Sequence, residues 1–163
     1  MLRITGIKEE TGESTDDIVL NMAKALGANI SVSDLDRSHR VGKPNPKPPV
    51  SLSDDTNTDT ETDTDTEPAP PAPKPRAIIV KFATYRARQV FYKTRTKAKT
   101  NGYKMVFVNE DLTKYRNGLL FEARELVKGE RPQGAFSSDG TILIKDNGNN
   151  VFRVMSVADL ARF

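Results

Sequence analysis

Cysteine is absent from this sequence of 163 residues, and histidine occurs only once, as His39. Without cysteine the chain can form no disulfide, no thiol nucleophile, no iron–sulfur cluster and no ordinary zinc finger. His39 has no second metal ligand near it in the sequence, so we expect it to form a hydrogen bond or to face a phosphate. We therefore expect no metal and no cofactor, and the absence of cysteine is in keeping with an intracellular protein.

Long apolar runs are also missing. The sequence has no run of about 18 apolar residues and no signal-peptide pattern at its start, so we expect no association with a membrane. The length allows one or two small domains. Because Met1 stands directly before a predicted strand at 2–7, we expect the chain to be a fragment whose upstream part is missing.

Proline is nearly confined to one segment, residues 43–75, which holds nine of the ten prolines and alternates threonine with acids at its centre. Its apolar content is too low to offset the entropy of ordering, so we expect a disordered, extended insertion. Two roles stay open for it: a solvating spacer, or an internal mimic that competes with nucleic acid. Outside the insertion the chain has 22 basic and 15 acidic residues, so its foldable part is basic.

The stretch of residues 76–100 predicts a buried strand, 76–82, followed by a basic helix with Thr84 as its N-cap. The apolar stripe of the helix comprises Ala87, Val90, Phe91 and Thr94, and the remaining positions include Arg86, Arg88, Lys93, Arg95, Lys97 and Lys99. No acid balances these cations, so the helix indicates either a phosphate-binding surface or a solvated basic face. We expect Val90→Asp to unfold the domain, whereas Arg86 and Arg88 are expected to be dispensable for stability.

Periodicity and capping residues predict the other elements. Helices are expected after Ser14, with Ile18, Met22, Ala25 and Leu26 as the apolar stripe and Gly27 as the stop, and from Asp111 or Thr113 to about residue 128. Further strands are expected at 2–7, 35–41, 104–109, 141–145 and 151–155, with another starting at Phe136 and a short helix after Ser156.

These elements predict an α+β fold. Without the insertion, residues 1–110 have the order βαββαβ, which is the ferredoxin-like order of an RNA-recognition-like domain. Residues 111–163 are expected to form a linking helix and a small α/β C-terminal domain. The outward positions that carry stacking rings in an RNA-recognition motif hold Arg3, Ala77 and Ile79 here, with Lys81 beside them, so the predicted platform is basic rather than aromatic.

Four segments together resemble a known family: RSHRVGK, PRAIIVKFATYRAR, VNEDLTKYRNGLLFEAREL and FSSDGTILIKD. They are similar to the RNA-recognition-like and C-terminal domains of the first-open-reading-frame protein of LINE-class non-LTR retrotransposons. They are also similar to the C-terminal region of the baculovirus few-polyhedra protein. The likeness covers residues 2–42 and 76–163. It implies a single-stranded nucleic-acid binder and chaperone that coats element RNA in a cytoplasmic or nuclear ribonucleoprotein.

The resemblance also implies where nucleic acid binds. Matching positions are Arg37 and Arg40 on the second strand, Arg76, Lys81, Arg86 and Arg88 on the strand-to-helix stretch, and Arg116 on the linking helix. The full expected set adds Arg3 and Lys93 from the basic platform and the basic helix. The family carries an upstream coiled coil that makes trimers, so self-association is expected through a segment that this chain lacks. The acidic insertion also departs from the family.

The preferred function is therefore sequence-general binding of single-stranded RNA or DNA. The alternative is a protein-interaction or structural module that kept the fold without nucleic-acid binding. A steep salt dependence of binding to homopolymer RNA separates the two. An enzyme is least favoured and no catalytic residue is expected, because the sequence has no phosphate-cradling glycine loop, no cysteine and no second histidine. Glu110 and Asp111 are interpreted as helix-start residues.

Overall fold

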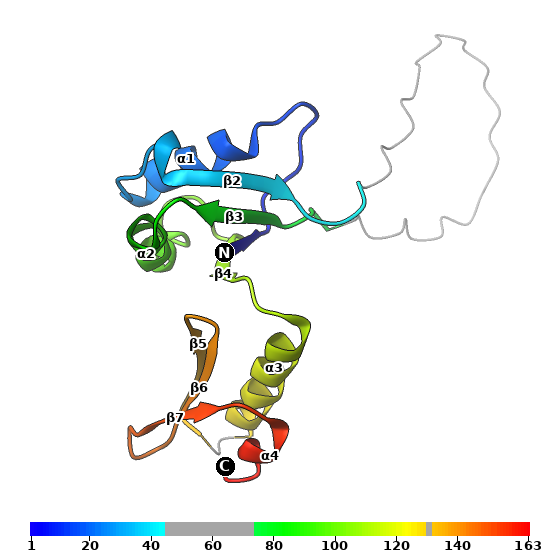
Figure 1. Cartoon of the computed structure of the whole chain (residues 1–163), viewed down its shortest axis with the longest axis vertical. Helices are drawn as coiled ribbons and strands as arrows, with labels where there is room; N and C mark the ends of the chain where they lie inside the picture. Colours follow the sequence, from blue (N-terminus) through cyan, green and yellow to red (C-terminus); the bar gives the residue numbers. More distant parts are fainter. Residues whose placement is uncertain (45–73, 130–131) are drawn as a thin grey trace, which may run out of the picture.

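A computed structural model describes residues 1–44, 74–129 and 132–163 (Figure 1). These residues form an α+β structure with two antiparallel sheets and four helices, which confirms the predicted class. The predicted insertion, 43–75, lies almost entirely outside the described residues, and so do the two roles considered for it. No helix in the described part of the chain is long and apolar enough to cross a membrane.

The first sheet has four strands in the order β2-β3-β1-β4, and every neighbouring pair is antiparallel. Its strands are β1 (Leu2–Thr5), β2 (Leu35–Arg40), β3 (Ile78–Phe82) and β4 (Phe107–Glu110). The helix α1 (Thr15–Leu26) follows β1, and α2 (Tyr85–Thr94) follows β3. A single-turn helix, η1 (Val32–Asp34), precedes β2, and another, η2 (Arg95–Lys97), continues α2.

One face of this sheet carries the first hydrophobic core. Leu2 and Ile4 of β1 and the alternating apolar residues of β3 pack against α1 and α2, as the period of two predicts. The rings of Phe82 and Phe91 lie 5.7 Å apart between sheet and helix. Both helices therefore cover the same face, and the other face is left open.

Local signals place the ends of α1 as predicted. The Ser14 side chain accepts a hydrogen bond from the Asp17 backbone N–H at 3.2 Å, and Gly27 ends the helix with a φ of 73°. That left-handed conformation suits glycine, which has no Cβ to strain it. The expected stripe is only partly right: Met22 and Leu26 are buried, but Ala25 is exposed and Ala23 is buried in its place.

Two expectations about α2 are wrong. The helix ends at Thr94 rather than near residue 100, and Val90 is 37% exposed. The buried face of the helix is centred on Ala87 and Phe91, which are 6% and 0% exposed. Val90 lies about 60° around the helix from Ala87 and about 100° from Phe91, so it is at the edge of the buried face. Val90→Asp is therefore no longer expected to bury a charge.

The second sheet belongs to the C-terminal part of the chain. It has the order β5-β6-β7, with β5 (Gly134–Ser138), β6 (Thr141–Lys145) and β7 (Val151–Val154). The helices are α3 (Lys114–Lys128), capped by Thr113 as predicted, and α4 (Val157–Leu160). The β5–β6 turn has positive φ at Asp139 (49°) and Gly140 (74°), which suits a tight hairpin.

The second hydrophobic core lies between α3 and this sheet. It contains Leu119, Leu120, Ala123, Ile142, Ile144, Val154 and Leu160. The first core draws on residues up to Val108 and the second on residues from Leu112 onward, so the two clusters lie on either side of residue 110. Figure 1 shows the two sheets one above the other, joined by the passage from β4 to α3.

Candidate nucleic-acid interface

The open face of the first sheet carries a row of three polar side chains and one isoleucine. His39 pairs with Ile79, Ile79 with Arg3, and Arg3 with Asn109, so each of the four strands contributes one residue to a single row. These residues alternate with the core-facing ones and point away from α1 and α2. Ile79 is covered, with 6% of its surface exposed, whereas His39 and Asn109 are exposed.

A second row of the open face contains the pair Arg37 and Lys81. The Lys81 ammonium lies 2.7 Å from the Asp36 carboxylate, and its hydrogen bond lowers the pKa of Asp36. Both members of this ion pair are about half exposed, so water and salt weaken it and it can open toward a phosphate. Arg37 is exposed and has no ion-pair partner among the described residues. The face is basic, as the sequence predicts.

An aromatic ring that sequence analysis missed also lies on this face. Phe107 of β4 pairs with Thr5 of β1, two residues from Asn109, and is 51% exposed. The positions on the first and third strands that carry rings in an RNA-recognition motif lack them here. The alternation of Phe107 with buried Val108 is the signal that would have placed the ring outward. The platform is therefore basic with one ring at its edge strand.

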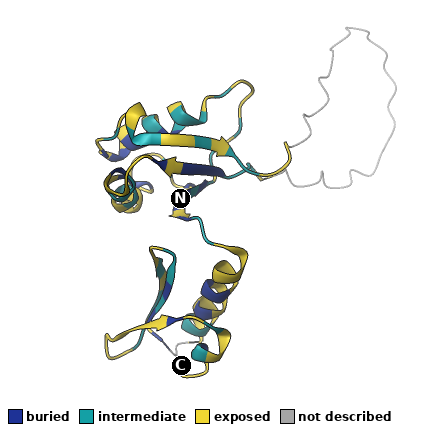
Figure 2. Cartoon of the chain, viewed as in Figure 1, coloured by how far each residue is buried: buried dark blue, intermediate teal, exposed yellow. Residues whose placement is uncertain are grey.

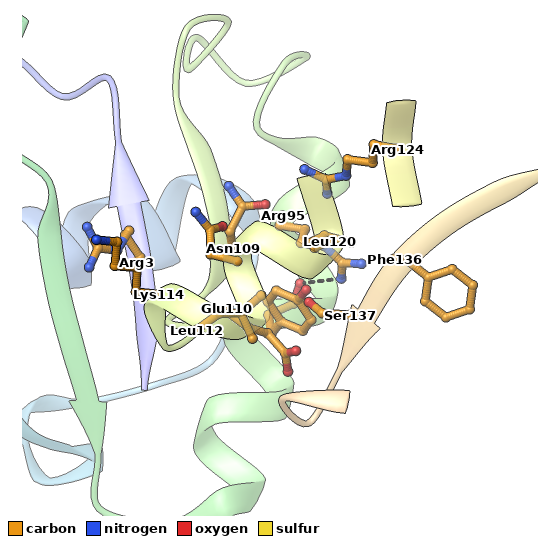
Figure 3. A pocket seen from close by; sticks show the side chains of 12 residues that line it. Arg3, Arg95, Asn109, Glu110, Leu112, Lys114, Leu120, Arg124, Phe136 and Ser137 are labelled. Atoms are coloured by element: carbon orange, nitrogen blue, oxygen red, sulfur yellow. Dashed lines mark hydrogen bonds between the residues drawn. The ribbon is translucent and has the colours of Figure 1, made fainter. Parts of the chain in front are cut away.

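A cleft of about 550 Å³ lies between the β4 side of the first sheet and the C-terminal part (Figure 3). Its four cations come from three parts of the chain: Arg3 on β1, Arg95 after α2, and Lys114 and Arg124 on α3. In Figure 3, Arg3, Asn109 and Lys114 lie on one side of the cleft, and Arg124 and Phe136 lie on the other. Four cations along one hollow favour an anionic occupant.

The cleft also has rings and amides. Its remaining lining residues are Tyr92, Asn109, Glu110, Leu112, Asn117, Leu120, Phe136 and Ser137. The Arg95 guanidinium carbon stacks 3.9 Å from the centre of the Tyr92 ring, and Arg95 Nη1 donates to the Tyr92 carbonyl at 2.9 Å. Burial raises the pKa of Tyr92, so this phenol stays neutral. Phe136 is 41% exposed, which leaves its ring available for stacking.

Glu110 is the one buried acidic residue among those described, with 6% of its surface exposed. Its carboxylate accepts hydrogen bonds from the backbone N–H groups of Asp139 (2.8 Å) and Gly140 (3.1 Å) and from Arg88. Burial alone would raise the pKa of Glu110, but the donors from Gly140, Ser137 and Arg88 together hold it below its usual value. The carboxylate is thus ionised, and the guanidinium of Arg88 balances its charge.

The earlier interpretation of Glu110 as a helix-start residue is wrong. It is the last residue of β4, and it fastens the first sheet to the β5–β6 turn. Arg88 of α2 reaches the same turn through Asp139 Oδ1 at 2.9 Å, and the Tyr85 hydroxyl donates to Asp139 Oδ2 at 2.8 Å. The hydrogen bond to Asp139 raises the pKa of Tyr85. These contacts hold one wall of the cleft in place.

Arg40 and Arg88 are predicted site residues whose side chains form internal ion pairs instead. The Arg40 side chain is 5% exposed; it donates to both oxygens of Glu13, at 2.6 and 2.9 Å, and to the carbonyls of Ile7, Lys8 and Arg76. Arg88 is 12% exposed and bridges Glu110 and Asp139. A guanidinium removed from water requires such partners. All five N–H donors of Arg40 are engaged, and Arg88 is mostly buried between two carboxylates.

Arg76 is largely engaged as well. Its Nε lies 3.0 Å from both Glu9 oxygens, and Nη1 donates to the Gly42 carbonyl at 3.1 Å. The hydrogen bond between Arg76 and Glu9 raises the pKa of the arginine and lowers that of the carboxyl. Together with Arg40, this pair stabilises the end of the β2–β3 ladder.

The other predicted site residues do not form one group. Arg3 keeps 43% of its side chain exposed although its Nη2 lies 2.9 Å from Asp111, and it belongs to both the open face and the cleft. Arg86 and Lys93 are exposed on α2 and have no ion-pair partner in the described part of the chain. Arg116 is exposed on α3 with its guanidinium beside Gly140.

The structure adds cleft residues that were absent from the predicted set. Arg95 was recognised only as part of the basic helix, and Lys114, Arg124, Asn109 and Asn117 were not singled out. Their convergence depends on how the two parts of the chain meet, which no local pattern reports. No group of three or more histidine, cysteine, aspartate or glutamate residues is placed to hold a metal ion within residues 1–44, 74–129 and 132–163.

In comparisons with known proteins, no family model matches the chain and no curated protein gives a significant match to it. The case for a function therefore depends on the chemistry of the site itself.

Proposed function

We propose that this chain binds single-stranded nucleic acid along the open face of the first sheet and in the cleft beside β4. The observation that carries the proposal is the cleft, where four cations lie with two rings and two side-chain amides. Cations neutralise phosphates, rings stack on bases, and amides hydrogen-bond to base edges. This combination matches a nucleotide chain better than a simple anion.

Each class of side chain has a proposed role. Arg3, Arg95 and Arg124 contact phosphates, and Asn109 and Asn117 contact base edges. Phe107 and Phe136 offer ring faces, which are sequence-tolerant because every base has a π-face. Arg37 and Lys81 extend the basic track across the sheet, whereas Arg40, Arg76 and Arg88 are left out of the proposed interface.

We further propose that the first unit is a ferredoxin-like, RNA-recognition-like domain. The order βαββαβ and the sheet order β2-β3-β1-β4 support it, as do two helices on one face of the sheet. On the strength of the four resembling segments, we propose a relationship to the first-open-reading-frame proteins of LINE-class retrotransposons. The corresponding role is a nucleic-acid chaperone in a cytoplasmic or nuclear ribonucleoprotein, without enzymatic activity.

Preference for single strands follows from the rings. In a duplex the base faces are stacked within the helix and are not available to Phe107 or Phe136. A single strand exposes both its base faces and its phosphates. We therefore expect tighter binding of single-stranded RNA and DNA than of duplex at the same salt concentration.

The second candidate is a structural or protein-interaction module without nucleic-acid binding. The observation that favours it is that three predicted contact residues, Arg40, Arg76 and Arg88, form internal ion pairs instead. A salt titration with homopolymer RNA discriminates the two. Binding by several phosphate contacts falls steeply with salt, because released counterions supply much of the affinity.

The test compares Arg95→Ala/Arg124→Ala with Lys24→Ala, which removes an exposed cation from the last turn of α1. Filter binding with single-stranded RNA, single-stranded DNA and duplex is measured over a salt series. We expect the cleft variant to bind single strands at least about tenfold more weakly and with a shallower salt slope. Lys24→Ala is expected to bind nearly as the parent does. Equal affinities of parent and cleft variant would overturn the proposed site.

A further inference from the structure

The outer side of α3 presents large apolar side chains to solvent. Tyr115 and Phe121 are each 60% exposed, and so is Val157 of the neighbouring α4. They line a shallow groove of about 830 Å³. Figure 2 shows the helix buried on its side toward the second sheet and exposed along its outer side. Tyr115 and Phe121 lie six residues apart, on the two flanks of this exposed side. Exposed apolar side chains of this size mark a surface for association, because burying them removes much apolar area from water.

Gly118 lies at the middle of this outer side. A Cβ at Gly118 would meet no atom of the described residues within 4 Å, so the packing of this chain does not require glycine there. Glycine within a helix destabilises it by about 1 kcal/mol relative to alanine. What glycine provides is close approach of another backbone to the helix.

The residues around Gly118 are complementary to themselves. An antiparallel copy of α3 related by a two-fold axis at Gly118 brings Tyr115 level with Phe121 of the second copy, on the two flanks of the contact. The same axis places Lys114 opposite Glu122 of the second copy, and every contact occurs twice. Lys114, Gly118 and Glu122 are spaced four residues apart and so share one side of the helix. Opposite charges thus meet on each side of the central glycine, and the rings border the contact.

We propose that a second copy of this chain docks antiparallel on the outer side of α3. Charge complementarity selects this occupant, because Lys114 and Glu122 each meet an opposite charge only when the helix meets itself in reverse. The two rings of each copy then lie along the borders of this contact. This contact is distinct from the coiled coil expected upstream, and it does not depend on nucleic-acid binding.

The experiment measures self-association of the full chain without nucleic acid, by sedimentation velocity over a wide concentration range. We expect a concentration-dependent monomer–dimer equilibrium. Lys114→Glu sets two carboxylates against each other at both contacts, and Glu122→Lys sets two ammonium groups against each other. Each single variant is expected to dimerise about tenfold more weakly or worse than the parent.

Charge reversal provides the specific control. An equimolar mixture of Lys114→Glu and Glu122→Lys restores both opposite-charge contacts in a heterodimer, and the double variant restores them in a homodimer. Both are therefore expected to recover the association of the parent. A dimer that is insensitive to the swaps, or a mixture that does not recover, would overturn the antiparallel α3 contact.

Gly118→Leu separates folding from docking. Leucine suits a helix better than glycine and meets open space here, so the melting temperature of the dilute protein is expected to rise. The same side chain holds two backbones apart, so dimerisation is expected to be lost. A chain that is monomeric at every concentration contradicts the proposal, and binding of some other protein to this face does not restore it.

Discussion

A single carboxylate, Glu110, connects the two parts of the chain. It lies at the end of a strand of the first sheet and accepts hydrogen bonds from a helix of the first unit and from the turn of the second sheet. An ionised buried group of this kind is stabilised only while its donors stay in place. The geometry of the cleft therefore depends on Glu110 although its own side chain is almost inaccessible.

Glu110→Ala is expected to destabilise the protein by about 3 kcal/mol, because Arg88 is left buried with only Asp139 as its partner. The free energy of unfolding is measured by urea denaturation with circular dichroism. Glu125→Ala is the matched control, since its ion pair with Lys128 is exposed and is expected to change stability by less than about 1 kcal/mol. Similar losses in the two variants would show that Glu110 is not a structural anchor.

Three carboxyl groups make the free energy of unfolding depend on pH in the acid range. Hydrogen bonds from Arg76 and Arg40 lower the pKa values of Glu9 and Glu13, and the pKa of Glu110 is lowered despite its burial. A carboxyl group whose pKa is lower in the folded state than its unfolded value of 4.5 stabilises the folded protein above that pH. This stabilisation is lost as the pH falls through the folded-state pKa. We expect the urea midpoint to be flat near neutrality and to fall below about pH 4.5.

The comparison variant for this pH dependence is Glu110→Gln, which keeps the shape of the side chain and removes its titration. Its midpoint is expected to be lower at neutral pH and to fall less on acidification. A parallel fall in both proteins would assign the acid sensitivity to the other carboxyls.

At the scale of elements, α2 has three faces with different contacts. Phe91 and Ala87 face the core, Arg88 faces Glu110 and Asp139, and Arg86 faces water. The basic helix was expected to present all its cations to nucleic acid. Instead one of them holds the C-terminal unit, because the β5–β6 turn packs against the side of the helix that carries it.

Variants along α2 distinguish these faces by stability alone. Phe91→Ala is expected to cost about 3–5 kcal/mol because it leaves a cavity in the core. Arg88→Ala is expected to cost about 3 kcal/mol because Glu110 loses its guanidinium. Arg86→Ala and Val90→Asp are each expected to change stability by less than about 1 kcal/mol, since both positions are exposed. Unfolding of the Val90→Asp protein would show that Val90 is buried in solution.

At the scale of the whole molecule, the first sheet closes without the acidic segment. The backbone N–H of Val41 donates to the Ala77 carbonyl at 2.8 Å, and Arg76 reaches the Gly42 carbonyl. Adjacent antiparallel strands thus bring the two ends of the insertion together. Replacing residues 45–73 by a few glycines is expected to change the free energy of unfolding by about 1 kcal/mol or less, because closure entropy varies slowly with loop length. Loss of a cooperative urea transition on this replacement would mean that the segment is structural.

Features that depend on a few neighbouring residues were determined by the sequence by itself. The caps at Ser14, Thr84 and Thr113 are examples, because each side chain accepts from a backbone N–H three residues away. The α+β class and the acidic composition of the insertion belong here too, since both follow from local periodicity and composition.

Only the tertiary structure decided which cations are free. Arg40 finds Glu13 across 27 residues, and Arg88 finds Glu110 across 22 residues and Asp139 across 51. The cleft is of the same kind, since Arg3 and Arg124 share it although they lie far apart in the chain. A charged side chain stays exposed or forms an ion pair according to what packs beside it. At a buried position it must have a partner, because a desolvated charge without one is strongly destabilising. The sequence shows the sign of each charge, whereas the fold decides which residue lies close enough to pair with it.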